Sequence, residues 1–489
     1  HSYFSIFLLH PGWFFYIITI RNNEKLRLSE IARLLGLIFQ KSLRITTMLK
    51  RKCFEKLEKW KNSTSKKALI VSGARQVGKT FLVEAFAKEQ YKSFIELNFI
   101  ANPELLSIFE GTLTTEAILT GIGLFFPQEK IIDGETLIFL DEIQECPNAV
   151  TALKFLSKSS AIDVIASGSA LGMSYNRVTS FPVGSVEYVD MTALDFKEFL
   201  WAMGISNDII NNVKEYYDKV EKIPEAIHNQ MMRYLKQYMV IGGMPEVVQT
   251  FIDNNQDYYS ADQVQRRIIR DYIADIARFA KPEIKIKAEA CYKSIPDQLN
   301  KENHKFQYSV VEKKGSARKF ESSVDWLINA DMAFAVHNVS YIEYPLRAHT
   351  VENSARIYPS DIGLLIGTYD YDLKKLIATD EFEGKATNII LKTVKGGLYE
   401  ALVADILMKN GHKNLFFYRN ESGTAELEFL IEDINGIIPI EVKAGRSGSK
   451  TLNNILKKED VYKGIKLASQ NIGVLDKKIT LPLYMAMFL

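Results

Sequence analysis

The chain has 489 residues, of which 47% are hydrophobic and 25% are charged, and its net charge is +2. This length exceeds what one core supports and predicts roughly two to four domains of ordinary globular protein. The small net charge means that any surface for nucleic acid is local. The three cysteines and seven histidines lack the spacing of a zinc site or a disulfide scaffold, which suits a reducing cytoplasm.

The first segment, residues 1–47, is interpreted as an upstream extension of the chain or as an artefact. Its stretch from Phe4 to Ile20 is strongly apolar but is interrupted by a His-Pro-Gly sequence. The stretch is short for a membrane span and lacks the basic leader of a signal peptide. The rival interpretation is a membrane anchor. From Met48 an amphipathic helix leads directly into the next strand.

The following stretch reads as a strand at Ala68–Val71, a loop, and a helix that starts near Lys79. The loop sequence GARQVGKT fits G-x-x-x-x-G-K-[ST] at every fixed position. Its glycines let the backbone approach a phosphate, its amides and the helix N-terminus present positive partial charge, and its lysine reaches the β- and γ-phosphates. We therefore predict a nucleotide-binding loop of Gly73, Ala74, Arg75, Gln76, Val77, Gly78, Lys79, Thr80 and Phe81.

A second apolar strand, TLIFLDEIQ, ends in two acids. A buried strand brings Asp141 to its carboxyl end, where this carboxylate and the Thr80 hydroxyl can ligate Mg²⁺. Glu142 is then the predicted catalytic residue, because it can act as general base on the attacking water. The order of the two motifs along the chain supports a nucleotide-hydrolysing site.

Two more strand patterns follow, at residues 163–170 and 186–191. The first carries Ser167 and Ser169, which we predict as sensors of a γ-phosphate, with plain turn chemistry as the alternative. Strands alternate with helices over residues 48–194. This alternation predicts an α/β domain with a parallel sheet covered on both faces.

The middle of the chain is predicted to form two further units. Residues 195–280 read as a helical lid, in which Gly242, Gly243 and Pro245 break the helices. Residues 281–390 resemble a winged-helix unit, a helix followed by short strands. Basic residues in this unit could meet phosphates, but acidic residues lie among them. A protein-contact module is therefore the alternative to a DNA reader.

The last segment, residues 391–489, reads as an amphipathic helix carrying Glu400, a hairpin carrying Glu428, and a third strand carrying Glu441 and Lys443. Alternate residues of a strand share a face, so Glu441 and Lys443 point the same way. Two carboxylates beside a lysine can hold Mg²⁺ and orient a water. We predict a nuclease-like site of these four residues, with Glu428 and Glu441 as metal ligands; the alternative is a solvent-facing salt bridge.

These motifs resemble those of prokaryotic AAA+ class P-loop ATPases that carry a C-terminal domain of unknown function. The resemblance covers nearly all of the chain after Met48 and rests on GARQVGKT, LIFLDEIQ, SGS, FPVG, GGMPE, YIADIARFA, YPSDIGLL and GGLYE…ELEFL…PIEVKAG. It implies a P-loop sheet, a helical lid, a winged-helix-like middle domain and a C-terminal domain similar to the PD-(D/E)XK nuclease fold. Two positions depart from the pattern: Glu428 stands where that superfamily usually has Asp, and Ser185 stands where relatives often show Arg.

The resemblance implies ATP and Mg²⁺ as cofactors and ATP hydrolysis as the activity. One hypothesis is an ATPase whose nucleotide state controls a nuclease-like domain acting on DNA. The other is a non-catalytic switch, in which the C-terminal domain only binds nucleic acid or a protein. ATP, DNA and further copies of the chain are the candidate partners, and no membrane contact is expected.

Overall fold

The computed structural model describes residues 3–9, 15–21, 49–64, 66–169, 182, 184–300, 305–379, 385–443 and 448–489; in 3–9, 15–21, 169, 379 and 385–395 it describes the backbone only. The chain divides into two units, His1–Leu49 and Lys50–Leu489. In the first unit, β1 (Tyr3–Leu9) pairs antiparallel with β2 (Phe15–Arg21). No helix in the described part of the chain is long and apolar enough to cross a membrane.

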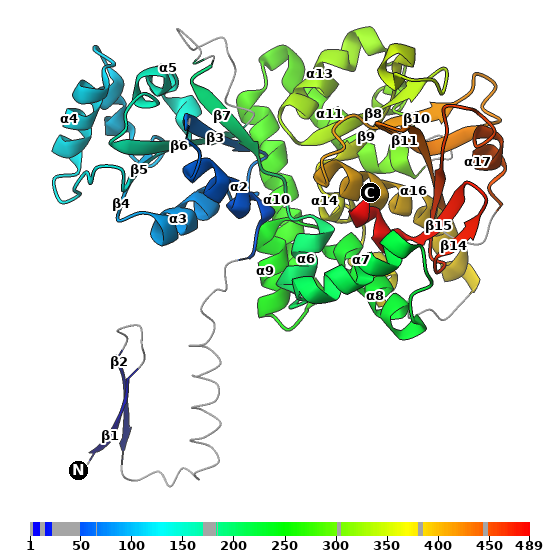
Figure 1. The fold of residues 1–489 in the computed structure, drawn as a ribbon, viewed down its shortest axis with the longest axis horizontal. Coiled ribbons are helices and arrows are strands. Elements are labelled where there is room, and N and C mark those ends of the chain that lie inside the picture. Colours follow the sequence, from blue (N-terminus) through cyan, green and yellow to red (C-terminus); the bar gives the residue numbers. More distant parts are fainter. Residues whose placement is uncertain are drawn as a thin grey trace. The chain divides into compact units, whose positions relative to one another are not determined.

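The second unit begins with a five-stranded parallel sheet of order β4-β5-β6-β3-β7. Every residue of β5 is buried, as expected for a strand covered on both faces, and Figure 1 shows α3 and α5 on opposite sides of the sheet. The prediction of a parallel α/β domain is confirmed. Its elements are α2 (Lys52–Lys61), β3 (Ala68–Gly73), α3 (Lys79–Gln90), β4 (Ser93–Asn98), η1 (Pro103–Phe109), α4 (Thr115–Phe125), β5 (Thr136–Asp141), η2 (Ile143–Glu145), α5 (Pro147–Leu156), β6 (Ile162–Ser169) and β7 (Val186–Asp190).

A run of helices follows the sheet. They are α6 (Phe196–Ala202), α7 (Asn207–Lys219), α8 (Glu225–Ile241), α9 (Pro245–Asp253), α10 (Tyr258–Phe279) and α11 (Pro282–Leu299). The break between α8 and α9 lies where Gly242, Gly243 and Pro245 predict it. A Cβ on Gly243 would lie 1.9 Å from the carbonyl oxygen of Leu194, so the close approach of these two segments requires glycine.

An eight-stranded sheet of order β14-β15-β13-β12-β11-β10-β8-β9 fills the C-terminal half. The β8–β9 hairpin, predicted as the wing, joins this sheet because β8 pairs in parallel with β10, with His337 opposite Phe416. The boundary predicted at 390 lies inside α16. The elements are α12 (Tyr308–Val311), α13 (Ala317–Asn329), β8 (Ala333–Val339), η4 (Leu346–His349), β9 (Thr350–Pro359), α14 (Ile362–Ile366), α15 (Tyr371–Thr379), α16 (Lys385–Lys409), β10 (Phe416–Arg419), β11 (Glu426–Asp433), β12 (Gly436–Lys443), α17 (Lys450–Ile455), β13 (Gly464–Ala468), β14 (Gly473–Leu475), β15 (Lys478–Pro482) and η5 (Leu483–Phe488).

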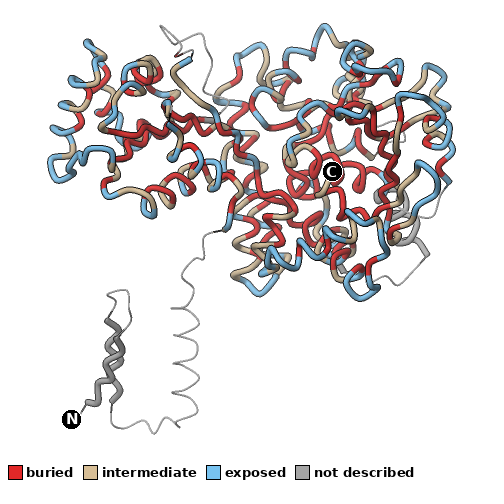
Figure 2. Tube along the Cα trace, in the orientation of Figure 1, coloured by how far each residue is buried: buried red, intermediate tan, exposed pale blue. Residues whose placement is uncertain are grey.

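A buried ion cluster joins the helical segment to the C-terminal half, where Figure 2 shows continuous buried chain. The Lys409 ammonium lies 2.7 Å from Asp361 Oδ2 and 2.8 Å from Asp405 Oδ1, and all three side chains are at most 2% exposed. Asp361 accepts a hydrogen bond from the Gly243 amide at 2.7 Å, and Asp405 lies 2.7 Å from the Tyr238 hydroxyl. The two carboxylates share one ammonium away from water. Burial raises the pKa of Asp405, the ammonium of Lys409 opposes this rise, and the nearby Asp361 adds to it. The cluster fixes α8, α14 and α16 to one another.

Candidate nucleotide site and C-terminal carboxylate cluster

The loop predicted to bind phosphate, here called the phosphate-binding loop, lies between a strand and a helix. It connects the end of β3 to the start of α3, and Gly73 and Gly78 have positive φ values of 146° and 92°. A Cβ on Gly73 would lie 2.0 Å from the carbonyl oxygen of Met191, so the loop can pack here only with glycine. Phe81, the last residue of the predicted set, is 53% exposed. A loop with glycines that leads into a helix N-terminus is the kind of segment in which backbone amides can bind an anion.

Lys79 is folded back onto its own loop. Its Nζ donates hydrogen bonds to the carbonyl oxygens of Gly73 at 2.9 Å and Ala74 at 2.7 Å. Burial lowers the pKa of Lys79 to about 8, against the opposing charges of Glu142 and Asp141. A phosphate would restore a strong counter-charge to this ammonium, so the lysine is set to exchange the carbonyl oxygens for an anion.

Asp141 is the centre of a buried hydrogen-bond cluster at the carboxyl ends of three strands and the start of α3. Its Oδ2 accepts from the Thr80 hydroxyl at 3.1 Å and from Asn98 Nδ2 at 3.0 Å, and its Oδ1 accepts from the Ser167 hydroxyl. Burial raises the pKa of Asp141, while the hydroxyl groups of Ser167 and Thr80 oppose the rise. The side chain of Ser169 lies outside the described residues. Thr80 and Asp141 thus present paired oxygen donors, which suit a hard cation such as Mg²⁺.

Asn98 is a site residue that the sequence analysis missed. It ends β4 directly opposite Asp141 in the strand register. A polar side chain at the end of a neighbouring strand was the available signal.

Glu142 follows Asp141 in the left-handed backbone region, with φ of 51°. This conformation is uncommon outside glycine, asparagine and aspartate. The Gln144 side-chain amide donates to one Glu142 carboxylate oxygen and orients it. The predicted general base therefore lies just beyond the end of β5, next to the buried acid that would hold the cation.

Helix α10 contacts the phosphate-binding loop through side chains that the sequence analysis did not single out. Asp275 forms an ion pair with Arg75, and Asp271 accepts a hydrogen bond from Gln76 Nε2 at 2.9 Å. The Tyr272 hydroxyl donates to the Arg75 carbonyl oxygen at 3.1 Å. The loop is thus bonded to the helical segment at two successive residues.

The C-terminal residues predicted as a nuclease-like site do come together, but around a lysine. Lys443 Nζ lies 3.0 Å from Glu428 Oε1 and 3.8 Å from Glu441 Oε1. The other Glu428 oxygen accepts from the Val442 amide at 3.1 Å. The buried Oε2 of Glu441 has no hydrogen-bond partner among the described residues. Burial raises the pKa of Glu428, and Lys443 opposes the rise.

Glu400 is held by an arginine that the sequence analysis did not identify. Arg356 of β9 is 1% exposed, and its Nη1 donates to Glu400 Oε1 at 2.8 Å. Its Nη2 forms an ion pair with Glu426, and the Tyr358 hydroxyl also donates to Glu400. The guanidinium lies 4.2 Å from the centre of the Phe417 ring. Arg356 therefore pairs with Glu400 and Glu426 at one end of this carboxylate cluster, and Lys443 pairs with Glu428 at the other.

The fit of a divalent metal to this cluster is poor. Among the described residues, no group of three or more His, Cys, Asp or Glu side chains could hold a metal ion. Glu441 offers one open oxygen, whereas both Glu428 oxygens and the Glu400 oxygen that faces Arg356 are already bonded. Mg²⁺ prefers about six oxygens, so a metal would require this arrangement to open.

Comparison with known proteins identifies the first part of the second unit. Residues 65–200 match the family described as AAA domain. This match and the five-stranded parallel sheet agree with an AAA-type P-loop fold for this segment. Residues 232–371 and 395–483 match two families described as domains of unknown function, DUF8612 and DUF4143. No curated protein matches the chain.

Solved structures similar to the chain are distant. A Walker-type ATPase of Pyrococcus abyssi is 13% identical with a TM-score of 0.39, over 66% of this chain and 96% of that chain. The Aeropyrum pernix ORC1 protein in complex with DNA is 11% identical with a TM-score of 0.26, over 68% and 91%. At such TM-scores the likeness says nothing about function.

The buried Lys79 predicts a pH-dependent stability. Between pH 8 and the ordinary lysine value of 10.5, the unfolded chain binds a proton that the folded chain has lost. Stability therefore rises with pH across this window. We expect the free energy of unfolding of wild type relative to Lys79→Met to rise by about 1–3 kcal/mol from pH 7.5 to 10.5 in urea titrations. A constant difference would contradict the depressed pKa.

The buried Arg356 cluster predicts a large loss of stability on truncation. Arg356→Met leaves the Glu400 and Glu426 carboxylates without their shared partner, and we expect a loss of about 3–5 kcal/mol in urea unfolding. The matched control is Lys214→Met, whose ion pair with Asp218 is exposed and should contribute less than about 1 kcal/mol. Similar effects of the two substitutions would contradict the cluster.

Proposed function

We propose that this protein binds ATP and hydrolyses it with Mg²⁺, and that its nucleotide state controls the C-terminal half. The observation that carries the proposal is the meeting of Thr80, Asp141 and Ser167 at one edge of the sheet, beside the loop that holds Lys79. These residues come from three separate segments. A hydroxyl, a buried carboxylate and a lysine at an anion-binding turn are the groups that nucleotide hydrolysis needs.

The chemistry follows from where each group lies. Lys79 would exchange two loop carbonyl oxygens for the β- and γ-phosphate oxygens. Thr80 and Asp141 would hold Mg²⁺, which neutralises charge on the phosphates when bound. Glu142, oriented by Gln144, would accept a proton from the attacking water.

The proposed control of the C-terminal half is supported by contacts that begin at the loop. Arg75 and Gln76 are bonded to α10, so a loop shift that admits phosphate pulls on this helix. Asp190, at the end of β7, accepts from the Ser72 hydroxyl at 2.7 Å and forms an ion pair with Lys413, just after α16. Both routes connect residues next to the phosphate site with residues beyond position 200.

Two substitutions separate binding from turnover. Lys79→Ala should remove most of the ATP affinity, because the phosphate loses its main cation. Glu142→Gln should retain affinity and lower turnover by about 10²–10⁴-fold, because only the proton acceptor is changed. Nucleotide titration and a Mg²⁺-dependent phosphate-release assay measure the two effects.

Lys88→Ala, on an exposed side chain of the same helix, is the matched control and should change neither quantity. Unaltered ATP affinity in Lys79→Ala would refute the site.

For the C-terminal domain, nuclease-like action on DNA is one candidate, and a nucleotide-dependent switch that only binds nucleic acid or protein is the second. The position of Arg356 favours the switch, since its guanidinium and the Lys443 ammonium already form ion pairs with Glu400 and Glu428. A buried charge that is satisfied internally has no need of a metal. DNA and further copies of the chain remain the proposed partners, in the cytoplasm.

A cleavage assay decides between the two candidates. We expect the purified protein to leave linear DNA intact with Mg²⁺ or Mn²⁺, and Lys443→Ala to behave alike. Cleavage that is lost in Lys443→Ala and on chelation of the metal, but persists in Lys450→Ala, would establish a nuclease and contradict the switch. Equal cleavage by all variants would point to a contaminant or a different site.

A further inference from the structure

A cavity of about 240 Å³ lies against the phosphate-binding loop. The loop forms one wall through Gly73, Ala74 and Val77, and the C-terminal half forms the opposite wall. The two carbonyl oxygens that Lys79 contacts belong to Gly73 and Ala74. The cavity therefore borders the predicted phosphate site directly.

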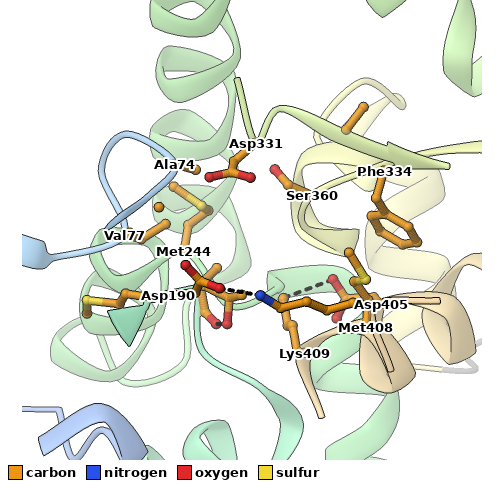
Figure 3. A pocket seen from close by; sticks show the side chains of 16 residues that line it. Ala74, Val77, Asp190, Met244, Asp331, Phe334, Ser360, Asp405, Met408 and Lys409 are labelled. Atoms are coloured by element: carbon orange, nitrogen blue, oxygen red, sulfur yellow. Dashed lines mark hydrogen bonds and ion pairs between the residues drawn. The ribbon is translucent and has the colours of Figure 1, made fainter. Parts of the chain in front are cut away.

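Asp331 is the unusual side chain of this cavity. It sits in the turn between α13 and β8 with φ of 55°, in the left-handed region. Figure 3 shows its carboxylate beside Ser360 on one side of the cavity, with Asp190 and Lys409 on the other. Among the described residues, no hydrogen bond or ion pair reaches the Asp331 side chain.

The other charged side chains of the cavity are paired. Asp190 is held by Lys413, and Asp405 by Lys409. Burial and the nearby Asp190 raise the pKa of Asp331 to about 6, against the opposing charges of Lys79 and Lys413. Asp331 is nevertheless accessible to solvent, so a ligand that enters the cavity can replace water as the hydrogen-bond donor to its carboxylate.

The chemistry of the cavity indicates which part of a ligand it takes. A carboxylate repels a phosphate group but accepts hydrogen bonds from neutral hydroxyl and amino groups. Apolar side chains of Val77, Met191, Met244 and Phe334 complete the lining and suit the face of a flat ring. The volume is just below the range of about 300–1,000 Å³ for whole-ligand pockets, as expected for a site that takes one part of a ligand.

We propose that this cavity receives the nucleoside part of the bound nucleotide, and that Asp331 accepts a hydrogen bond from a ribose hydroxyl or from the amino group of the base. The inference rests on the proposed nucleotide site and extends it to a residue outside the AAA domain. The segment that follows the helical lid then completes the site in the same chain. Nucleotide binding would draw the β8 turn towards the loop.

The test compares ATP with inorganic tripolyphosphate, which lacks a nucleoside, by calorimetric titration. Asp331→Gly removes the side chain and tolerates positive φ; Asp331→Asn keeps the size and the backbone preference. We expect Asp331→Gly to weaken ATP about 10-fold or more, Asp331→Asn to weaken it less, and both to bind tripolyphosphate like wild type. Retained tripolyphosphate binding shows that the loop is folded.

A control variant and a second nucleotide show which group of ATP donates the hydrogen bond to Asp331. Asp325→Asn, an exposed acid of α13, is the matched control and should change nothing. A loss seen with ATP but not with 2′-deoxy-ATP assigns the donor to the 2′-hydroxyl, and equal losses assign it to the base or the 3′-hydroxyl.

Unchanged ATP affinity in Asp331→Gly would overturn the inference and leave the nucleotide site intact. Tighter binding of both ligands would also overturn it, because the carboxylate would then be a competitor of phosphate for Lys79. Failure of wild type to bind either ligand would overturn the proposed function and this inference together.

Discussion

The buried ammonium of Lys409 is the interaction on which the arrangement of the C-terminal half depends. Two carboxylates, Asp361 and Asp405, would repel each other strongly without it, because little water reaches them. Their remaining lone pairs are met by the Gly243 amide and the Tyr238 hydroxyl. Segments of α8, α14 and α16 therefore meet at this cluster, where a buried carboxylate without a partner would be costly. This requirement gives a physical reason for the glycines of GGMPE and for the aspartate of YPSDIGLL.

The same cluster reaches the proposed nucleotide site through the segment after β7. The Tyr238 hydroxyl lies 2.9 Å from the Leu194 carbonyl oxygen, and the Leu194 amide donates to the Gly243 carbonyl oxygen at 2.7 Å. That segment also carries Met191, whose carbonyl oxygen packs against Gly73 of the phosphate-binding loop. A short chain of close contacts thus links a charge cluster in the C-terminal half to the backbone that would face the phosphates. Such contacts are poorly compressible and pass small shifts on to their neighbours.

Sequence patterns located the candidate residues of the nucleotide site where those residues belong to one short segment. GARQVGKT occupies one loop, and LIFLDE one strand end, so the order of residues along the chain already fixes the positions of Lys79, Asp141 and Glu142. The grouping of Glu428, Glu441 and Lys443 also followed from strand periodicity. Periodicity could not reveal Arg356, however, because its partner Glu400 lies 44 residues away on a helix.

Asp331 and Asn98 were missed for a related reason. Each is a single polar residue in a turn or at a strand end, and the role proposed for it depends on residues that another segment supplies. Which residues are buried and which distant segments pair cannot be read from local sequence patterns. The winged-helix comparison illustrates the same limit, since the strands of the expected wing are completed by β10 from the next segment.

The parallel pairing of β8 with β10 has a consequence for how this chain can be divided. A cut near residue 390 would look natural from the family matches, yet it would separate two neighbouring strands of one sheet. Each fragment would then present a row of unpaired amides and carbonyls, a template for association with other chains. The two regions described as domains of unknown function are therefore better regarded as one unit. The backbone hydrogen bonds between β8 and β10 take one strand from each region.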